Sequence, residues 1–152
     1  MTSQPSDILI VNGPNLNLIG TREPDIYGFE TFIDIENKAR KEADALGLSL
    51  CWMQSNHEGE LVTEIQAAVK NNRAIVINAA AYTHTSIALR DALGIFTGPK
   101  IEIHLSNIHR REPFRHTSML IDMCDGTVAG FGSMSYQLGI QAAAHLLSAK
   151  QK

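Results

Sequence analysis

Apolar runs of strand length alternate with segments of helical periodicity along this 152-residue chain. The runs cover residues 7–12, 48–54, 74–79, 100–105 and 126–132. They show little alternation with polar residues, and strands of this kind are typically buried on both faces of a parallel sheet. A strand followed by a helix five times therefore predicts an α/β fold, specifically a flavodoxin-like three-layer sandwich with a five-stranded parallel sheet.

The helical segments begin with capping signals. Thr31 and Asp34 predict a capping box for the helix over residues 31–47, and Ser55 and Glu58 predict another one. The helix after Ser55 is expected to bury one face, made of Leu61, Ile65, Ala68 and Val69. Helices over residues 84–94 and 133–147 complete the pattern, and residues 1–6 and 150–152 are expected to be loose ends.

Length and composition favour one globular domain over residues 1–152. Hydrophobic residues make up 44% of the chain and charged residues 19%, which excludes disordered and fibrous classes. The net charge of -3 argues against nucleic acid as a partner. The first residues lack the pattern of a signal peptide and no apolar run is long enough for a membrane span, so we expect a cytoplasmic protein without membrane contact.

Cysteine and histidine patterns argue against a metal site. Cys51 and Cys124 form no C-x-x-C motif, so neither a disulfide framework nor a zinc site is predicted. His104, His109 and His116 lack the helical i, i+4 spacing of known zinc motifs. The pattern predicts proton-transfer chemistry with no metal and no cofactor.

Polar side chains gather where three of the predicted strands end. They are Asn12 and Asn15 after the first strand, Asn78 after the third, and Glu102, His104 and Ser106 in and after the fourth. Ligands of open parallel sheets bind outside the carboxyl ends of the strands, near the point where strand order reverses. We therefore expect these side chains to line one crevice.

The loop over residues 13–28, "GPNLNLIGTREPDIYG", is longer than an ordinary strand-to-helix connection. It has no phosphate-loop motif. Two interpretations are open: a solvated loop in which Arg22 is a surface charge and Tyr27 covers an apolar patch, or a lid over the crevice. A guanidinium near a phenol lowers the phenol's pKa, so a lid carrying both residues would suit base catalysis.

Two further segments carry candidate groups. Thr83 or Thr85 could simply cap the next helix, whereas His84 is expected at the helix start, beside backbone N–H groups that attract anions. Glu102 and His104 lie two residues apart, hence on the same face of a strand, as either a structural ion pair or an oriented general acid. Three arginines follow this pair in the sequence, Arg110, Arg111 and Arg115. They form either a solvated basic patch or a binding site for an anionic substrate.

The motifs "GPNLNLIGTREPDIYG", "THTSIALRDAL" and "EIHLSN" together resemble the type II 3-dehydroquinate dehydratases. The similarity runs from about residue 8 to residue 147. Two departures are small: Ala80 stands where a glycine is expected, and "GFGSMSYQLGI" is a looser match. The resemblance implies dehydration of 3-dehydroquinate to 3-dehydroshikimate by anti elimination through an enolate, in the shikimate or quinate pathway.

The resemblance also implies a role for each matched residue. Tyr27 corresponds to the catalytic base with Arg22 beside it, Asn15 to the residue that holds a water against the enolate oxygen, and His104, backed by Glu102, to the acid. Asn78, His84, Leu105, Ser106 and Arg115 correspond to substrate contacts, Arg111 to a lid-closing contact, and Asp91 to an aspartate that reaches the site of a neighbouring subunit. The implied assembly is a dodecamer of four trimers.

Two other functions use the same residues differently. A non-catalytic flavodoxin-like module binding a nucleotide or small anion would use the crevice and its arginines, but it needs neither Tyr27 nor the Glu102–His104 pair. A metal-dependent hydrolase would need a ligand spacing that the sequence lacks.

Overall fold

The chain is described by a computed structural model that covers residues 4–21 and 30–150. Its five strands form one parallel sheet in the order β2-β1-β3-β4-β5. The strands are β1 (Ser6–Asn12), β2 (Leu50–Gln54), β3 (Asn72–Asn78), β4 (Lys100–His104) and β5 (Gly126–Ala129). This is the flavodoxin-like strand order, and it confirms the predicted fold class. Strand order reverses between β1 and β3.

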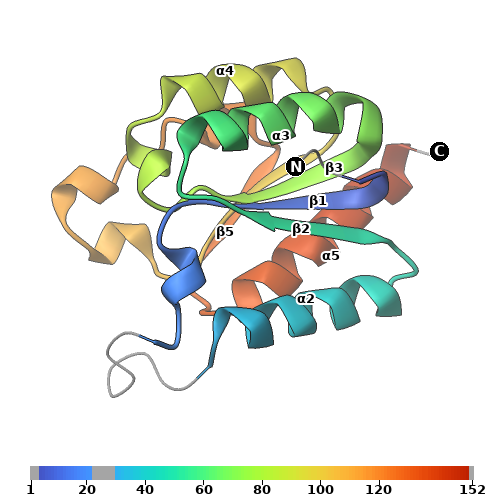
Figure 1. Cartoon of the computed structure of the whole chain (residues 1–152), viewed down its shortest axis with the longest axis horizontal. Helices are drawn as coiled ribbons and strands as arrows, with labels where there is room; N and C mark the ends of the chain where they lie inside the picture. Colours follow the sequence, from blue (N-terminus) through green and yellow to red (C-terminus); the bar gives the residue numbers. More distant parts are fainter. Residues whose placement is uncertain (1–3, 22–29, 151–152) are drawn as a thin grey trace.

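Within the described residues, four α-helices cover the sheet in two pairs. They are α2 (Phe32–Ala45), α3 (Glu58–Asn71), α4 (Ile87–Ile95) and α5 (Met134–Lys150). α3 packs against α4 on one face of the sheet, and α2 packs against α5 on the other (Figure 1). Alternate strand residues supply the two cores: Ile8 and Ile10 face α2 and α5, whereas Leu9 and Val11 face α3 and α4.

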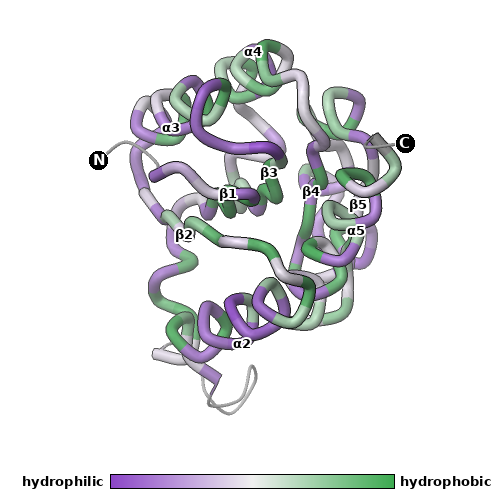
Figure 2. Tube along the Cα trace, turned by 90° about the vertical axis from the view of Figure 1, so that its right-hand side faces the viewer, coloured by the Kyte–Doolittle hydropathy of each residue, from purple (hydrophilic) through white to green (hydrophobic). Residues whose placement is uncertain are grey.

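The hydrophobic pattern explains this arrangement. All four of those β1 side chains are fully buried, as expected for a strand with helices on both faces. Figure 2 shows the strands between the two helix pairs; hydrophilic residues are most frequent along α2, whereas α4 is mostly hydrophobic. Burial of these alternating faces, and not any single contact, stabilises the three layers.

The predicted helix starts were partly right. Thr31 and Asp34 form the expected capping box at α2. The prediction for Ser55 was wrong, because α3 begins after His57, and the Ser55 hydroxyl accepts from His57 N–H (2.9 Å) and donates to Glu60. Val69 is 46% exposed, so it does not share the buried face of α3.

The connection from β4 to β5 and the two ends of the described chain also differ from the prediction. Three 3-10 helices, η3 (Ile108–Arg110), η4 (Pro113–Arg115) and η5 (Ile121–Met123), stand between β4 and β5, so a helix does not follow each strand. Residues 4–6 are not loose, since Ser6 begins β1 and Asn72 Nδ2 donates to Ser6 Oγ (2.8 Å). α5 also continues to Lys150, beyond the predicted helix end.

Candidate active site at the carboxyl edge of the sheet

The carboxyl ends of β1 and β3 are joined by a buried chain of hydrogen bonds. Asn12 and Asn78 are neighbours in the strand register. Tyr136 of α5 donates its hydroxyl proton to Asn12 Oδ1 (2.6 Å) and accepts from Asn78 Nδ2 (3.0 Å), while Asn12 Nδ2 donates to Met53 O (3.0 Å). Burial raises the pKa of Tyr136, so its hydroxyl remains protonated and able to donate. These hydrogen bonds fix the orientation of the Asn78 side-chain amide.

The loop after β1 lies close against the end of β3. Gly13 N–H donates to Asn78 O (2.8 Å), and a Cβ at Gly13 would stand 2.3 Å from Ala79 O. Only glycine permits this approach. Asn15 then precedes η1 (Leu16–Leu18) in the left-handed region, with φ 69°, and its N–H donates to Asn56 Oδ1 (3.0 Å). The exposed side chain of Asn15 therefore projects from a constrained backbone.

At the end of β4, Glu102 and His104 form the expected pair. Glu102 Oε2 lies 2.8 Å from His104 Nε2, and Glu102 and His104 are 1% and 5% exposed. A carboxylate can only accept, so this bond places a proton on Nε2 and leaves Nδ1 for another partner. Ser118 Oγ donates to the second oxygen of Glu102 (2.6 Å). The Glu102 carboxylate therefore holds a buried imidazole, that of His104, in one orientation at the carboxyl edge of the sheet.

His84 lies beside this pair, although not where the sequence placed it. It ends η2 (Ala80–His84), while α4 begins after Ser86, whose hydroxyl accepts from Leu89 N–H (2.9 Å). Neither Thr83 nor Thr85 is the cap, and the expectation of His84 at the helix start was wrong. The rings of His84 and His104 are nearly parallel (17°), with centroids 6.5 Å apart. The two imidazoles therefore share one side of the edge.

Positive charge is provided by the segment after η3. Arg115 Nε donates to Glu112 Oε1 (3.3 Å), and its guanidinium lies over the Phe114 ring, 5.1 Å from the centroid. Arg111 Nε is 3.8 Å from the same carboxylate. The backbone N–H of Glu112, then Arg115 and Arg111, lower the pKa of Glu112, so this carboxylate offsets one positive charge. Since η4 contacts η2, Arg115 lies on the same side as His84.

The other predicted site residues are more scattered. Leu105 is half-buried and its carbonyl accepts from Gly132 N–H (2.9 Å), whereas Ser106 is exposed. Asp91 is exposed on α4. Arg22 and Tyr27 lie outside the described residues. The structure thus brings Asn78, His84, Glu102 and His104 to one edge of the sheet.

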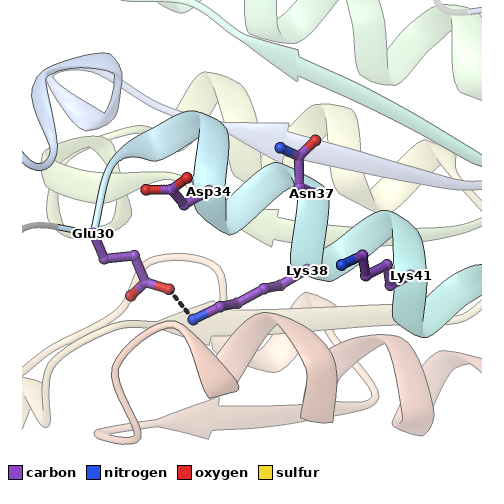
Figure 3. Close-up of a pocket in the computed structure, with 5 residues that line it drawn as sticks. All are labelled: Glu30, Asp34, Asn37, Lys38 and Lys41. Carbon is purple, nitrogen blue, oxygen red and sulfur yellow. Dashed lines mark hydrogen bonds and ion pairs between the residues drawn. The ribbon is translucent and has the colours of Figure 1, made fainter.

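A surface hollow of about 470 Å³ lies elsewhere, along α2 (Figure 3). It is lined by Glu30, Asp34, Asn37, Lys38 and Lys41, none of which is a predicted site residue. Glu30 and Lys38 pair across it, and Lys38 is 53% exposed. A solvent-exposed ion pair of this kind is common on protein surfaces, so the carboxyl edge of the sheet, with its buried Glu102–His104 pair, is the better candidate for an active site.

The described part of the chain has neither a cluster of metal-binding side chains nor a helix suited to span a membrane. No group of three or more His, Cys, Asp or Glu side chains there is arranged to hold a metal ion. None of the helices described there combines the length and apolar character needed to span a bilayer. Both cysteines are free thiols, and burial raises the pKa of Cys124 to about 12, which makes it a poor nucleophile near neutral pH.

Comparison with known protein families shows to which family the chain belongs. The family model described as "Dehydroquinase class II" matches residues 6–144. The chain belongs to the class II dehydroquinases. This confirms the family resemblance drawn from the three sequence motifs.

Individual relatives agree over nearly the whole chain. The 3-dehydroquinate dehydratase of Dinoroseobacter shibae is 50% identical over 143 residues, covering 93% of this chain and 95% of the relative. The catabolic 3-dehydroquinase of Emericella nidulans is 52% identical over 134 residues, covering 88% of each. The crystal structure of the type II dehydroquinase from Propionibacterium acnes has a TM-score of 0.86 and 39% identity, over 95% of this chain and 99% of that one.

Ala80, which stands where the resemblance leads us to expect a glycine, has an unusual backbone conformation. Ala80 adopts φ 51°, in the left-handed region that a side chain disfavours, and its N–H donates to Asn78 Oδ1 (3.3 Å). A glycine would adopt this conformation without strain. In this class II dehydroquinase the turn after β3 therefore holds an alanine in a conformation that favours glycine.

Sequence reasoning missed the partners of the site residues. Ser118 binds Glu102, Tyr136 binds Asn78, and Thr117 O lies 2.9 Å from His84 Nδ1. Tyr136 falls in the part of the chain that matched the family motifs least well. Its position among the apolar residues of α5 that face the sheet was the available signal, because a buried tyrosine hydroxyl usually requires a partner.

Proposed function

We propose that this class II dehydroquinase converts 3-dehydroquinate to 3-dehydroshikimate and water by anti elimination. The proposal rests on one observation above all, the buried Glu102–His104 pair at the carboxyl edge, in a chain whose relatives bear the name 3-dehydroquinate dehydratase. A binding module would not need an imidazole held in this way, whereas a departing hydroxyl group needs a proton donor.

The reaction begins at the carbon beside the ketone. The Tyr27 phenolate takes a proton from that carbon, and the C–H electron pair moves to form an enolate. Arg22 favours the phenolate form by its positive charge. Asn15 holds a water that donates to the enolate oxygen, which stabilises the charge that develops there.

The second step expels the hydroxyl group. The enolate electrons re-form the ketone and shift to the new carbon–carbon double bond as the carbon–oxygen bond breaks. His104 acts here as the imidazolium, protonated on both nitrogens: Nε2–H stays on Glu102, and Nδ1–H gives the proton that turns the departing hydroxide into water, which leaves the neutral imidazole. Asn78, His84, Leu105, Ser106 and Arg115 bind the substrate's carboxylate and hydroxyls, and Arg111 contacts the closed lid. No step requires a metal or cofactor.

We also propose that the active sites form between subunits. Ile87, Asp91 and Ile95 lie at i, i+4, i+8 on α4, and the two isoleucines are 59% and 58% exposed. Exposed apolar side chains on either side of a carboxylate suit contact with another copy of the chain. Asp91 then serves the neighbour's Arg22 and Tyr27 in a dodecamer of four trimers. Light scattering should give a mass near twelve chains.

The physiological setting follows from the reaction. The same dehydration serves the shikimate pathway and quinate breakdown, and a 3-dehydroquinate dehydratase from Acaryochloris marina and the catabolic enzyme from Emericella nidulans are both 52% identical to this chain. Free thiols at both cysteines suit a reducing compartment, so we place the reaction in the cytoplasm.

The test is direct. Purified protein mixed with 3-dehydroquinate should produce the ultraviolet absorption of a conjugated ketone, before and after exhaustive chelation of metals. Tyr27→Phe should lower kcat by several powers of ten and leave KM nearly unchanged, since the base acts only in the transition state. Flat absorbance from folded wild-type protein would favour the binding module instead. Recovery of lost activity by a divalent ion after chelation would contradict the metal-free mechanism.

A shared site has its own test. Inactive Asp91→Ala subunits mixed with inactive Tyr27→Phe subunits should regain some activity in hybrid sites that hold both native residues. A fully active monomer would exclude the shared site, whereas an active trimer would retain it and remove only the higher assembly.

A further inference from the structure

The segment over residues 117–122 contacts the environment of both site histidines. Thr117 O lies 2.9 Å from His84 Nδ1, and a carbonyl can only accept, so Nδ1 carries a proton. The next residue, Ser118, binds the carboxylate that holds His104. Two successive residues of one segment therefore determine which nitrogen of each imidazole remains for another partner.

The direction of the Ser118 hydrogen bond is fixed by its neighbours. Leu120 N–H donates to Ser118 Oγ (3.1 Å), and the Glu102 carboxylate, 2.6 Å away, can only accept. The hydroxyl proton must therefore point at Glu102 Oε1. With His104 on Oε2 and Ser118 on Oε1, both oxygens of this 1% exposed carboxylate have a donor.

The segment is itself anchored to the helical layer. Met119 N–H donates to Thr83 O (2.8 Å), and Met119 O accepts from Arg90 Nη1 (2.9 Å). Arg90 also forms a two-pronged ion pair with Asp122, with Nη2 2.7 Å from Oδ2. Asp122 raises the pKa of Arg90, and Arg90 lowers that of Asp122. These bonds hold residues 117–122 in place independently of any substrate.

We propose that Ser118 is a positioning residue for the dehydration: its hydroxyl holds Glu102, and Glu102 in turn keeps His104 with Nε2 protonated and Nδ1 directed at the departing hydroxyl. This inference rests on the proposed function of the site. Ser118 itself touches no reacting atom. Loss of its bond leaves Glu102 Oε1 buried without this donor and removes a restraint on rotation of the carboxylate, which loosens its hold on His104.

The test compares three variants of the full chain. Ser118→Ala should lower kcat by about 10- to 100-fold, the range expected for losing a hydrogen bond to a charged group, and change KM by less than about threefold. Ser118→Thr keeps the hydroxyl and should recover most of kcat. Ser49→Ala is the matched control, because Ser49 Oγ also donates to a carboxylate, that of Asp7 (3.0 Å), at the opposite edge of the sheet. Its kcat and KM should equal those of the wild type.

A second readout separates this inference from the function on which it rests. The ¹⁵N chemical shifts of the His104 ring report which nitrogen carries the proton. They should show a protonated Nε2 in the wild type and change in Ser118→Ala but not in Ser49→Ala. If the wild type does not dehydrate 3-dehydroquinate, the proposed function fails, and the ring signals alone decide whether Ser118 positions His104. Unchanged ring signals, or kcat within twofold in a folded Ser118→Ala, would overturn the inference.

Discussion

The two edges of the sheet place polar residues in opposite environments. At the amino edge, Asp7 bonds to Arg73 (2.9 Å) and to Ser49 N–H (2.9 Å) near solvent, with the Arg73 side chain 43% exposed. At the carboxyl edge, Asn12, Asn78, Glu102 and His104 are all at most 5% exposed and linked to one another or to Tyr136 and Ser118. Exposed pairs contribute little, whereas buried networks are costly unless every group is satisfied.

Backbone strain follows the same division. Among the described residues, the two non-glycine residues with positive φ, Asn15 and Ala80, both follow strands at the carboxyl edge. Near the amino edge the turn between α2 and β2 uses Gly47 for its positive φ (71°). In the part of the chain that the structure describes, positive φ at non-glycine residues is thus found after strands at the carboxyl edge, the edge that also holds the buried Glu102–His104 pair, and strain of this kind supports the carboxyl edge as the candidate functional one.

The largest expected contrast between the edges is in activity. His104→Ala removes the proton donor and should reduce kcat by about 10²- to 10⁴-fold, the usual contribution of general acid catalysis. Arg73→Ala, at the amino edge, should leave kcat unchanged. Steady-state kinetics with 3-dehydroquinate measures both. Equal losses in the two variants would mean that the edges do not differ in function.

A change in stability comes next. Tyr136→Phe keeps the ring packed on Trp52 (5.2 Å between centroids) but leaves Asn12 Oδ1 and Asn78 Nδ2 without their shared partner. The free energy of unfolding should fall by about 1–3 kcal/mol, as for buried polar groups left unsatisfied. Urea denaturation measures this, and KM should also rise because Asn78 is no longer oriented. A stability equal to wild type would show that the buried chain contributes nothing.

The strain at Ala80 predicts a smaller gain. Ala80→Gly should raise the free energy of unfolding by about 0.5–1 kcal/mol, because glycine adopts φ 51° without steric cost but loses more entropy on folding. Thermal or urea unfolding would detect it, with Gly47→Ala at the other edge expected to destabilise. A loss of stability in Ala80→Gly would mean that the alanine methyl makes packing contacts that outweigh the strain.

The smallest expected effect is on stability at low pH. Ser49 N–H, and after it Arg73, lower the pKa of Asp7 below its ordinary value of 3.8. A lowered folded-state pKa stabilises the fold fully above pH 3.8, and this contribution disappears as the pH falls through the folded-state value. Asp7→Asn should therefore be slightly less stable than wild type at pH 7, and the difference should shrink as the pH falls below 3.8. A difference that persists in acid would assign the effect to packing.

Much of the fold could be read from the chain because burial on both faces leaves a local record. The apolar run of β1 and the capping box at Thr31 were predicted correctly. Predictions failed where short-range chemistry has close competitors: Ser86 and not a neighbouring threonine caps α4, and Ser55 bonds to Glu60 ahead of α3. Several serines and threonines near a helix start can make similar bonds, so tertiary packing selects among them.

The sequence by itself determined the three layers, the gathering of polar residues at the carboxyl edge, and the Glu102–His104 pair, since residues two apart on a strand necessarily face the same side. Only the tertiary structure decided which groups hold that pair. Ser118 is 16 residues from Glu102, and Tyr136 is 58 residues from Asn78. Such contacts depend on the path of the η3–η5 connection and on the position of α5 against the sheet. Packing of the whole core sets both, and it leaves no periodic pattern in the sequence.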